Sequence, residues 1–213
     1  MNRAGALALG LVLAVAAPQR ARADELSDGE IVAWGAGMAI PTYFLGVTMH
    51  EGAHALAAWS VGAKIEEIQL WPGFVDGRFY FGYTRWSGTL TRNEHVFALL
   101  APTIMELGLL GGYALLLDQD ALPDDDRAEL AVAMLPAIAW ADLVKNLISF
   151  NDTNDMMRIH ALHGRTRELQ RLPIRVLQLA IVVGGGVVLY RGARRLFDEP
   201  DRAPVLPLFA VTF

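Results

Sequence analysis

Residues 31–60 read IVAWGAGMAIPTYFLGVTMHEGAHALAAWS, an apolar segment that carries His50, Glu51 and His54 near its end. About 20 apolar residues in a helix suffice to cross a bilayer. At 3.6 residues per turn, His50 and His54 lie on one face of that helix, where both imidazoles can reach one metal ion while Glu51 stays beside it. Because ionisable groups inside an apolar span are costly, this cluster favours a functional site.

Three further apolar segments, at 96–117, 130–150 and 174–190, are also near the length of a membrane span. The chain is 54% hydrophobic and only 19% charged, against roughly 25% charged in an average soluble domain. We therefore expect an all-α, multi-pass integral membrane protein, a bundle of about four transmembrane helices. Three glycines at 184–186 predict that the last helix packs closely against a neighbour.

Charges in the segments that connect the predicted spans indicate how the spans are oriented in the membrane, because Lys and Arg are retained on the cytoplasmic side. Several of them lie at 61–95 and 151–175, whereas the connection at 118–129 is acidic and is expected outside. The ends of the first and third spans then lie on the same face, in a bacterial-type inner (plasma) membrane. The arginines beyond residue 190 disagree with this scheme, so a re-entrant fourth segment is the alternative.

The segments outside the spans also carry patterns. Residues 1–23 combine Arg3, an apolar run and a small-x-small triplet, which is typical of a signal peptide, with a retained signal anchor as the alternative. The membrane domain then covers residues 24–192, and residues 193–213 form a C-terminal tail. Apolar residues alternate on both sides of an Asp-Gly pair at 76–77, which predicts a small membrane-associated β-hairpin.

Composition restricts the chemistry. The chain contains no cysteine, which excludes disulfides, iron–sulfur clusters and thiolate zinc sites. Zn²⁺ held by two histidines and one carboxylate keeps a fourth position for water and lowers the pKa of that water, while a glutamate that is not a ligand moves the proton. The net charge of −5 offers no basic field for phosphates, so nucleic acid is not expected as a partner.

A third ligand is expected from the segment at 145–159, KNLISFNDTNDMMRI, where Asp152 and Asp155 compete. With this segment and the His-Glu-x-x-His helix, residues 31–160 resemble the site-2 protease family of intramembrane zinc metalloproteases. That family follows its His-Glu-x-x-His helix with an Asn-Leu-x-Pro segment and then an Asp-Gly that supplies the third ligand. One extra loop residue aligns Asp155 with that aspartate, and Met156 replaces the glycine.

The resemblance implies a role for each matched residue. His50, His54 and Asp155 would hold the zinc, and Glu51 would be the general base. Asn146, at the start of the second motif, would orient the substrate backbone through its amide.

The resulting prediction is a zinc-dependent metallopeptidase that hydrolyses peptide bonds within or beside the lipid bilayer, with a membrane protein or peptide as substrate. One alternative is a non-catalytic relative that binds membrane partners without cutting them. The other is a metal-handling transport protein, since intramembrane His, Glu and Asp also line ion paths. The absence of an evident inverted repeat in the sequence argues against a transporter.

Other polar residues in the spans are expected to have structural roles. Asp142 and Lys145, three residues apart on one helix, are expected to pair. Glu106 lies in the middle of the second span, and three arrangements are open to it: facing the metal cavity, pairing with Lys145, or lying protonated. The remaining histidines are expected at the surface: His95, His160 and His163.

Overall fold

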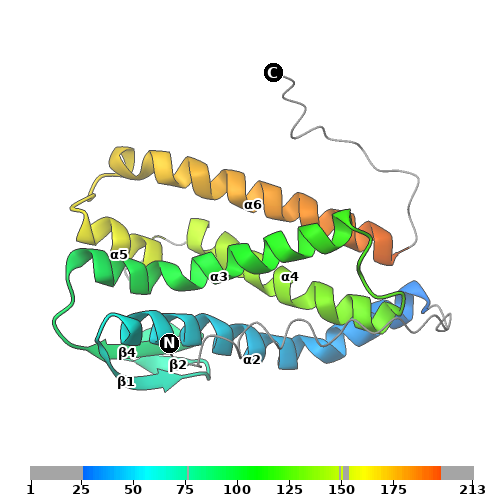
Figure 1. The fold of residues 1–213 in the computed structure, drawn as a ribbon, viewed down its shortest axis with the longest axis horizontal. Coiled ribbons are helices and arrows are strands. Elements are labelled where there is room, and N and C mark those ends of the chain that lie inside the picture. Colours follow the sequence, from blue (N-terminus) through cyan, green and yellow to red (C-terminus); the bar gives the residue numbers. More distant parts are fainter. Residues whose placement is uncertain (1–25, 76, 149, 151–153, 198–213) are drawn as a thin grey trace, which may run out of the picture.

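The computed structural model describes residues 26–75, 77–148, 150 and 154–197 (Figure 1). Within these residues, four helices are long and apolar enough to cross a membrane, which confirms the predicted helical segments and their order. The predicted signal segment and most of the predicted tail lie outside the described residues. The four helices are α2 (Asp28–Ser60), α3 (Arg92–Asp118), α4 (Asp126–Ile148) and α6 (Glu168–Leu196).

Each helix begins before the apolar residues that predicted it, because polar residues form its first turn. At the start of α3, the Thr91 hydroxyl accepts a hydrogen bond from the backbone N–H of Glu94 at 3.4 Å, and the Glu94 carboxylate accepts one from the backbone N–H of Thr91 at 2.7 Å. This capping box satisfies backbone donors that have no partner inside the helix. Apolar patterning does not detect such a turn.

The α6 helix is continuous, without the break that a re-entrant segment would need, and it packs against α4 and α3. A Cβ atom added at Gly185 would lie 2.7 Å from the Trp140 ring of α4. The Trp140 indole N–H donates to the Val182 carbonyl at 2.7 Å. The predicted close packing is therefore confirmed at Gly185, where a larger residue would push the two helices apart, whereas a Cβ added at Gly184 would have no neighbour within 4 Å.

Large apolar side chains are exposed along the outer face of α6, including Leu172, Val176, Leu179 and Val183. Contiguous apolar surface of this kind is unusual for a monomeric soluble protein. It is consistent with a multi-pass membrane protein whose outer faces contact lipid.

Two of the arginines that disagreed with the predicted orientation, Arg191 and Arg195, form ion pairs. Arg191 donates to Asp118 at 2.6 Å, and Arg195 contacts Glu129 at 3.2 Å and also Asp120. The acidic residues come from the end of α3, the α3–α4 connection and the start of α4. The connection that was predicted to lie outside thus supplies counter-charges for the arginines at the end of α6.

Four short strands follow α2, and they confirm the predicted hairpin (Figure 1). Gly77 has φ +75°, in the left-handed region that glycine adopts at tight turns. Next to this turn, β2 (Gly73–Val75) pairs antiparallel with β3 (Arg78–Tyr80). The flanking strands, β1 (Lys64–Gln69) and β4 (Tyr83–Ser87), form a second antiparallel pair, and both contact α2.

A short helix that was not expected from the sequence, α5 (Asp155–Leu162), follows α4. Its residues Met156 and Ile159 are buried against Leu99 of α3. This contact fixes the position of the first residue of α5, Asp155. Figure 1 shows α5 at the same end of the bundle as the strands.

One histidine of α5 differs from the sequence-based expectation. His160 is only 1% exposed, so its predicted surface position is wrong. Neither of its ring nitrogens has a hydrogen-bond partner among the described residues. Burial lowers the pKa of His160, and the charges of Arg171, Arg165 and Arg175 lower it further, against a smaller opposite effect of Glu168.

Stability should therefore depend on pH through His160. Because its pKa is lower in the folded protein than the ordinary value of about 6.5, the unfolded chain binds more protons below that pH. Above about pH 6.5, His160 is neutral in both states and the free energy of unfolding is not reduced by it. As the pH falls from there toward the folded pKa of His160, proton binding by the unfolded chain lowers the free energy of unfolding. We expect the thermal unfolding midpoint to fall less between pH 7.5 and 5.5 in His160→Phe than in the wild type. An identical pH dependence in both proteins would contradict the assignment.

Candidate metal centre

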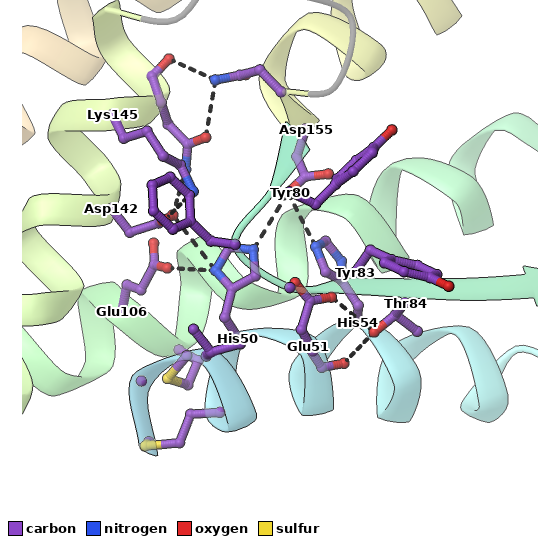
Figure 2. Close-up of a pocket in the computed structure, with 18 of the residues that line it drawn as sticks. His50, Glu51, His54, Tyr80, Tyr83, Thr84, Glu106, Asp142, Lys145 and Asp155 are labelled. Atoms are coloured by element: carbon purple, nitrogen blue, oxygen red, sulfur yellow. Dashed lines mark hydrogen bonds and ion pairs between the residues drawn. The ribbon is translucent and has the colours of Figure 1, made fainter. Parts of the chain in front are cut away.

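The motif on α2 presents two imidazoles on one face of the helix. The ring centroids of His50 and His54 lie 5.0 Å apart, as expected for residues one helical turn apart. Figure 2 shows both rings pointing away from the α2 axis and toward Asp155. Glu51 lies beside them and is only 6% exposed.

Asp155, the first residue of α5, completes a group of three possible ligands. Its Oδ2 atom lies 3.1 Å from His54 Nε2 and 3.6 Å from His50 Nε2. One ligand atom from each of the three residues lies within 4.8 Å of the others, close enough to hold one ion. The structure thus brings together the residues that the sequence proposed as ligands, whereas Asp152 lies outside the described residues.

A hydrogen bond to each histidine determines which nitrogen faces Asp155. His54 Nδ1 lies 2.8 Å from the backbone carbonyl oxygen of Ala98, and His50 Nδ1 lies 2.9 Å from Glu106 Oε1. A carbonyl oxygen only accepts, so His54 donates to it from Nδ1, and a neutral His54 that keeps this bond would bind an ion through the lone pair of Nε2. Metal-bound histidines commonly have such a partner on the other nitrogen.

Glu106 belongs to a second charged group on the far side of His50. It is 2% exposed, and the Asp142 Oδ2 atom lies 3.5 Å from the same His50 nitrogen. Lys145 pairs with Asp142, as predicted. Of the three arrangements considered for Glu106, the structure has it facing His50 and the cavity. His50, Glu106 and Asp142 are also close enough to hold a cation, but the Lys145 ammonium already supplies positive charge there.

Strand β4 contacts the candidate base. The Thr84 hydroxyl lies 2.9 Å from Glu51 Oε2 and 3.0 Å from the Glu51 backbone oxygen. One hydroxyl proton serves one of these acceptors at a time. Thr84 was not identified from the sequence. A threonine in a predicted strand gives no indication that it contacts a glutamate 33 positions earlier in the chain.

Gly82 allows the strands to approach α2. A Cβ atom added at this position would lie 2.6 Å from a methyl group of Val47 and 3.1 Å from Cγ of Glu51. Next to it, the Tyr43 hydroxyl donates to the Phe81 carbonyl at 2.9 Å. The turn between β3 and β4 therefore lies directly on the helix that carries the motif.

Asn146 and Asn154 connect α4 to the start of α5. The Asn154 side chain accepts from the backbone N–H of Met157 at 3.1 Å and donates to Asn146 Oδ1 at 3.1 Å. The Asn146 amide then donates to Asp142 at 2.9 Å. Asn146 is only 4% exposed, and its predicted contact with substrate stays a prediction. Asn154 was missed, although an asparagine before an acidic first turn is a helix-capping signal.

Asp155 remains ionised in this setting. Burial raises the pKa of its carboxyl group, but hydrogen bonds from His50 and His54 together with their charges outweigh burial, and the pKa lies well below the ordinary value. A carboxylate must be deprotonated to bind a metal ion.

The site opens into a cavity of about 1130 Å³. Its wall includes His50, His54, Asp155 and Glu51, residues of β3 and β4, and apolar residues from α3 and α4. Tyr80 and Tyr83 lie over the same side of the site in Figure 2. A space of this size can hold a peptide segment with several side chains.

No protein-family model matches the chain, and the comparisons with characterised proteins and with solved structures found no match either. Function must therefore be inferred from the site itself.

Proposed function

We propose that the chain is an intramembrane zinc metalloprotease that hydrolyses peptide bonds of membrane-embedded or membrane-adjacent substrates. The observation that carries the proposal is the meeting of His50, His54 and Asp155, beside the carboxylate of Glu51, on a helix long and apolar enough to span a membrane. The similarity of these residues to the site-2 protease motifs supports the same function.

The donor set fits zinc. Two imidazole nitrogens and one carboxylate oxygen form a ligand set typical of catalytic zinc sites, which keep one position open. Because His54 donates to the Ala98 carbonyl from Nδ1, its Nε2 atom is the nitrogen that would bind the ion, and the low pKa of Asp155 keeps its carboxylate charged. Zinc, when bound, supplies a Lewis acid and a water whose pKa is lowered toward about 7.

Glu51 would act as the general base. Its carboxylate accepts a proton from the attacking water and passes this proton to the leaving nitrogen as the peptide bond breaks. Thr84 holds Oε2 of this carboxylate, which leaves Oε1 for the proton. The 6% exposure of Glu51 limits competition from bulk water.

The substrate would be bound as an extended peptide. A peptide bond inside a membrane helix is protected by its backbone hydrogen bonds, so a segment must unwind before water attacks it. The β1–β4 pair is two-stranded among the described residues, so each strand has an edge that can accept an added strand. Because Thr84 of β4 contacts Glu51, a peptide on that strand would lie beside the base.

We place the protein in a bacterial-type inner (plasma) membrane as a multi-pass protein, with the site toward the cytoplasmic face. The support is the distribution of Lys and Arg between the connections. The strands lie at the same end of the bundle as α5, the helix that begins with the proposed ligand Asp155 (Figure 1).

Removal of metal tests the proposal. We expect the purified full-length protein in detergent to contain about one zinc ion per chain, and to hydrolyse an unfolded probe such as dye-labelled casein. Treatment with a strong chelator should reduce this hydrolysis at least about tenfold, and added zinc should restore it. Hydrolysis that survives complete removal of zinc would contradict the proposal.

A further inference from the structure

We propose that Pro102 is a positioning residue for the metal ligand His54. By lacking a backbone N–H, it leaves the carbonyl of Ala98 free to accept a hydrogen bond from the imidazole. The inference rests on the proposed zinc site, and it assigns a chemical role to a residue that does not itself contact the ion.

Pro102 removes one backbone hydrogen bond from the interior of α3. In an α-helix, the carbonyl of residue i accepts from the N–H of residue i+4. For Ala98 that residue is Pro102, which has no N–H. The α3 helix nevertheless runs from Arg92 to Asp118 with Pro102 inside it. The Ala98 carbonyl therefore lacks its regular intrahelical partner.

Burial makes that carbonyl a strong acceptor for another donor. Ala98 is 0% exposed and Pro102 is fully buried, so water has little access to the oxygen. An unpaired buried carbonyl is costly, and a donor that reaches it is held firmly. His54 Nδ1 is that donor, at 2.8 Å, from a residue 44 positions earlier in the chain.

Small residues bring the two helices close enough for this bond. Ala98 packs with Ala57, Ala58 and Ala63 in one buried cluster where α2 meets α3. Alanines at a helix contact allow the backbones to approach. The donor on α2 and the acceptor on α3 are thus held by packing that is independent of any metal ion.

The bond determines how His54 can bind a metal ion. With hydrogen on Nδ1, neutral imidazole has its lone pair on Nε2, the nitrogen that faces Asp155. The other tautomer would point an N–H at the ion. A free carbonyl at Ala98 therefore selects the ligating tautomer and fixes the direction of the ring.

A purely structural role for Pro102 predicts a different result from a positioning role. Pro102→Ala restores an N–H that competes for the Ala98 carbonyl. Since alanine is much the better residue inside a helix, the variant should fold at least as well as the wild type without metal. A structural role thus leaves zinc affinity unchanged, whereas a positioning role requires zinc affinity to fall while the helix is not weakened.

The experiment measures zinc affinity of the full chain in detergent by competition with a chromophoric chelator. We expect Pro102→Ala to bind zinc at least about tenfold more weakly than the wild type, and the visible spectrum of bound Co²⁺ to change. Thermal unfolding of the metal-free protein reports folding. Pro136→Ala is the matched control, because Pro136 is also buried inside a helix but the carbonyl it frees belongs to Val132, away from the proposed ligands.

Zinc affinity within about twofold of the wild type, with an unchanged Co²⁺ spectrum, would overturn the inference. Pro102→Gly also restores the N–H and adds no side chain, so it gives the same test if the alanine variant does not fold. A wild-type protein that binds no zinc would overturn the proposed function and this inference together. A wild type that binds zinc, beside an unaffected Pro102→Ala, would overturn this inference alone.

Discussion

Replacement of Glu51 by glutamine is expected to reduce peptide hydrolysis by about 10²–10⁴-fold while the protein keeps its zinc. The glutamine amide cannot accept the proton of the attacking water. Its carbonyl oxygen can still accept the hydrogen bond that Thr84 donates to Glu51 in the structure. The two histidines are unaffected, so the change separates proton transfer from metal binding.

Hydrolysis of the labelled casein probe and zinc content should be measured on the same preparations. Glu67→Gln, which removes the same charge from an exposed position on β1, is the control and should leave both unchanged. Full hydrolysis by Glu51→Gln would exclude Glu51 as the base. If the wild type holds zinc and captures a peptide but never cuts it, the non-catalytic alternative replaces the protease.

Loss of Asp155 should have the largest effect on metal binding. We expect Asp155→Ala to weaken zinc binding by more than about 100-fold, because a direct ligand is removed and partners of ligands already account for about 10–100-fold. His50 and His54 would then lose the carboxylate that lies 3.6 and 3.1 Å from their Nε2 atoms. Zinc content after dialysis, measured by elemental analysis, checks this result.

The neighbouring Asp152 gives a matched control for this prediction, since its replacement removes the same charge three residues earlier. Asp152→Ala should retain zinc. If instead Asp152→Ala loses zinc and Asp155→Ala retains it, the third ligand is Asp152, and the contact between Asp155 and the histidines has another role.

Several parts of the fold followed from the sequence because they depend on local patterns. Length and apolarity predicted the four long helices, and the spacing of His50 and His54 placed both rings on one face. The Asp-Gly pair predicted the strand turn. The close approach of Gly185 to Trp140 also followed, because glycines in a membrane helix let a neighbouring helix pack against the backbone.

Contacts between distant segments could not be predicted in the same way. The α5 helix has only eight residues, and its position depends on burial of Met156 and Ile159 against α3. The bond from Thr84 to Glu51 depends on how β4 packs on α2. His160 is buried because α5 docks, and nothing in its local sequence distinguishes it from an exposed histidine.

An ion bound by the proposed ligands would join two distant parts of the chain. His54 and Asp155 are 101 residues apart in a protein that has no cysteine. An ion held between them would act as a cross-link closing a loop of that length, for which the chain-entropy treatment of disulfides gives about 4–5 kcal/mol. Metal supply would then control the conformational freedom of the polypeptide as well as its chemistry, through a bond that chelation can reverse.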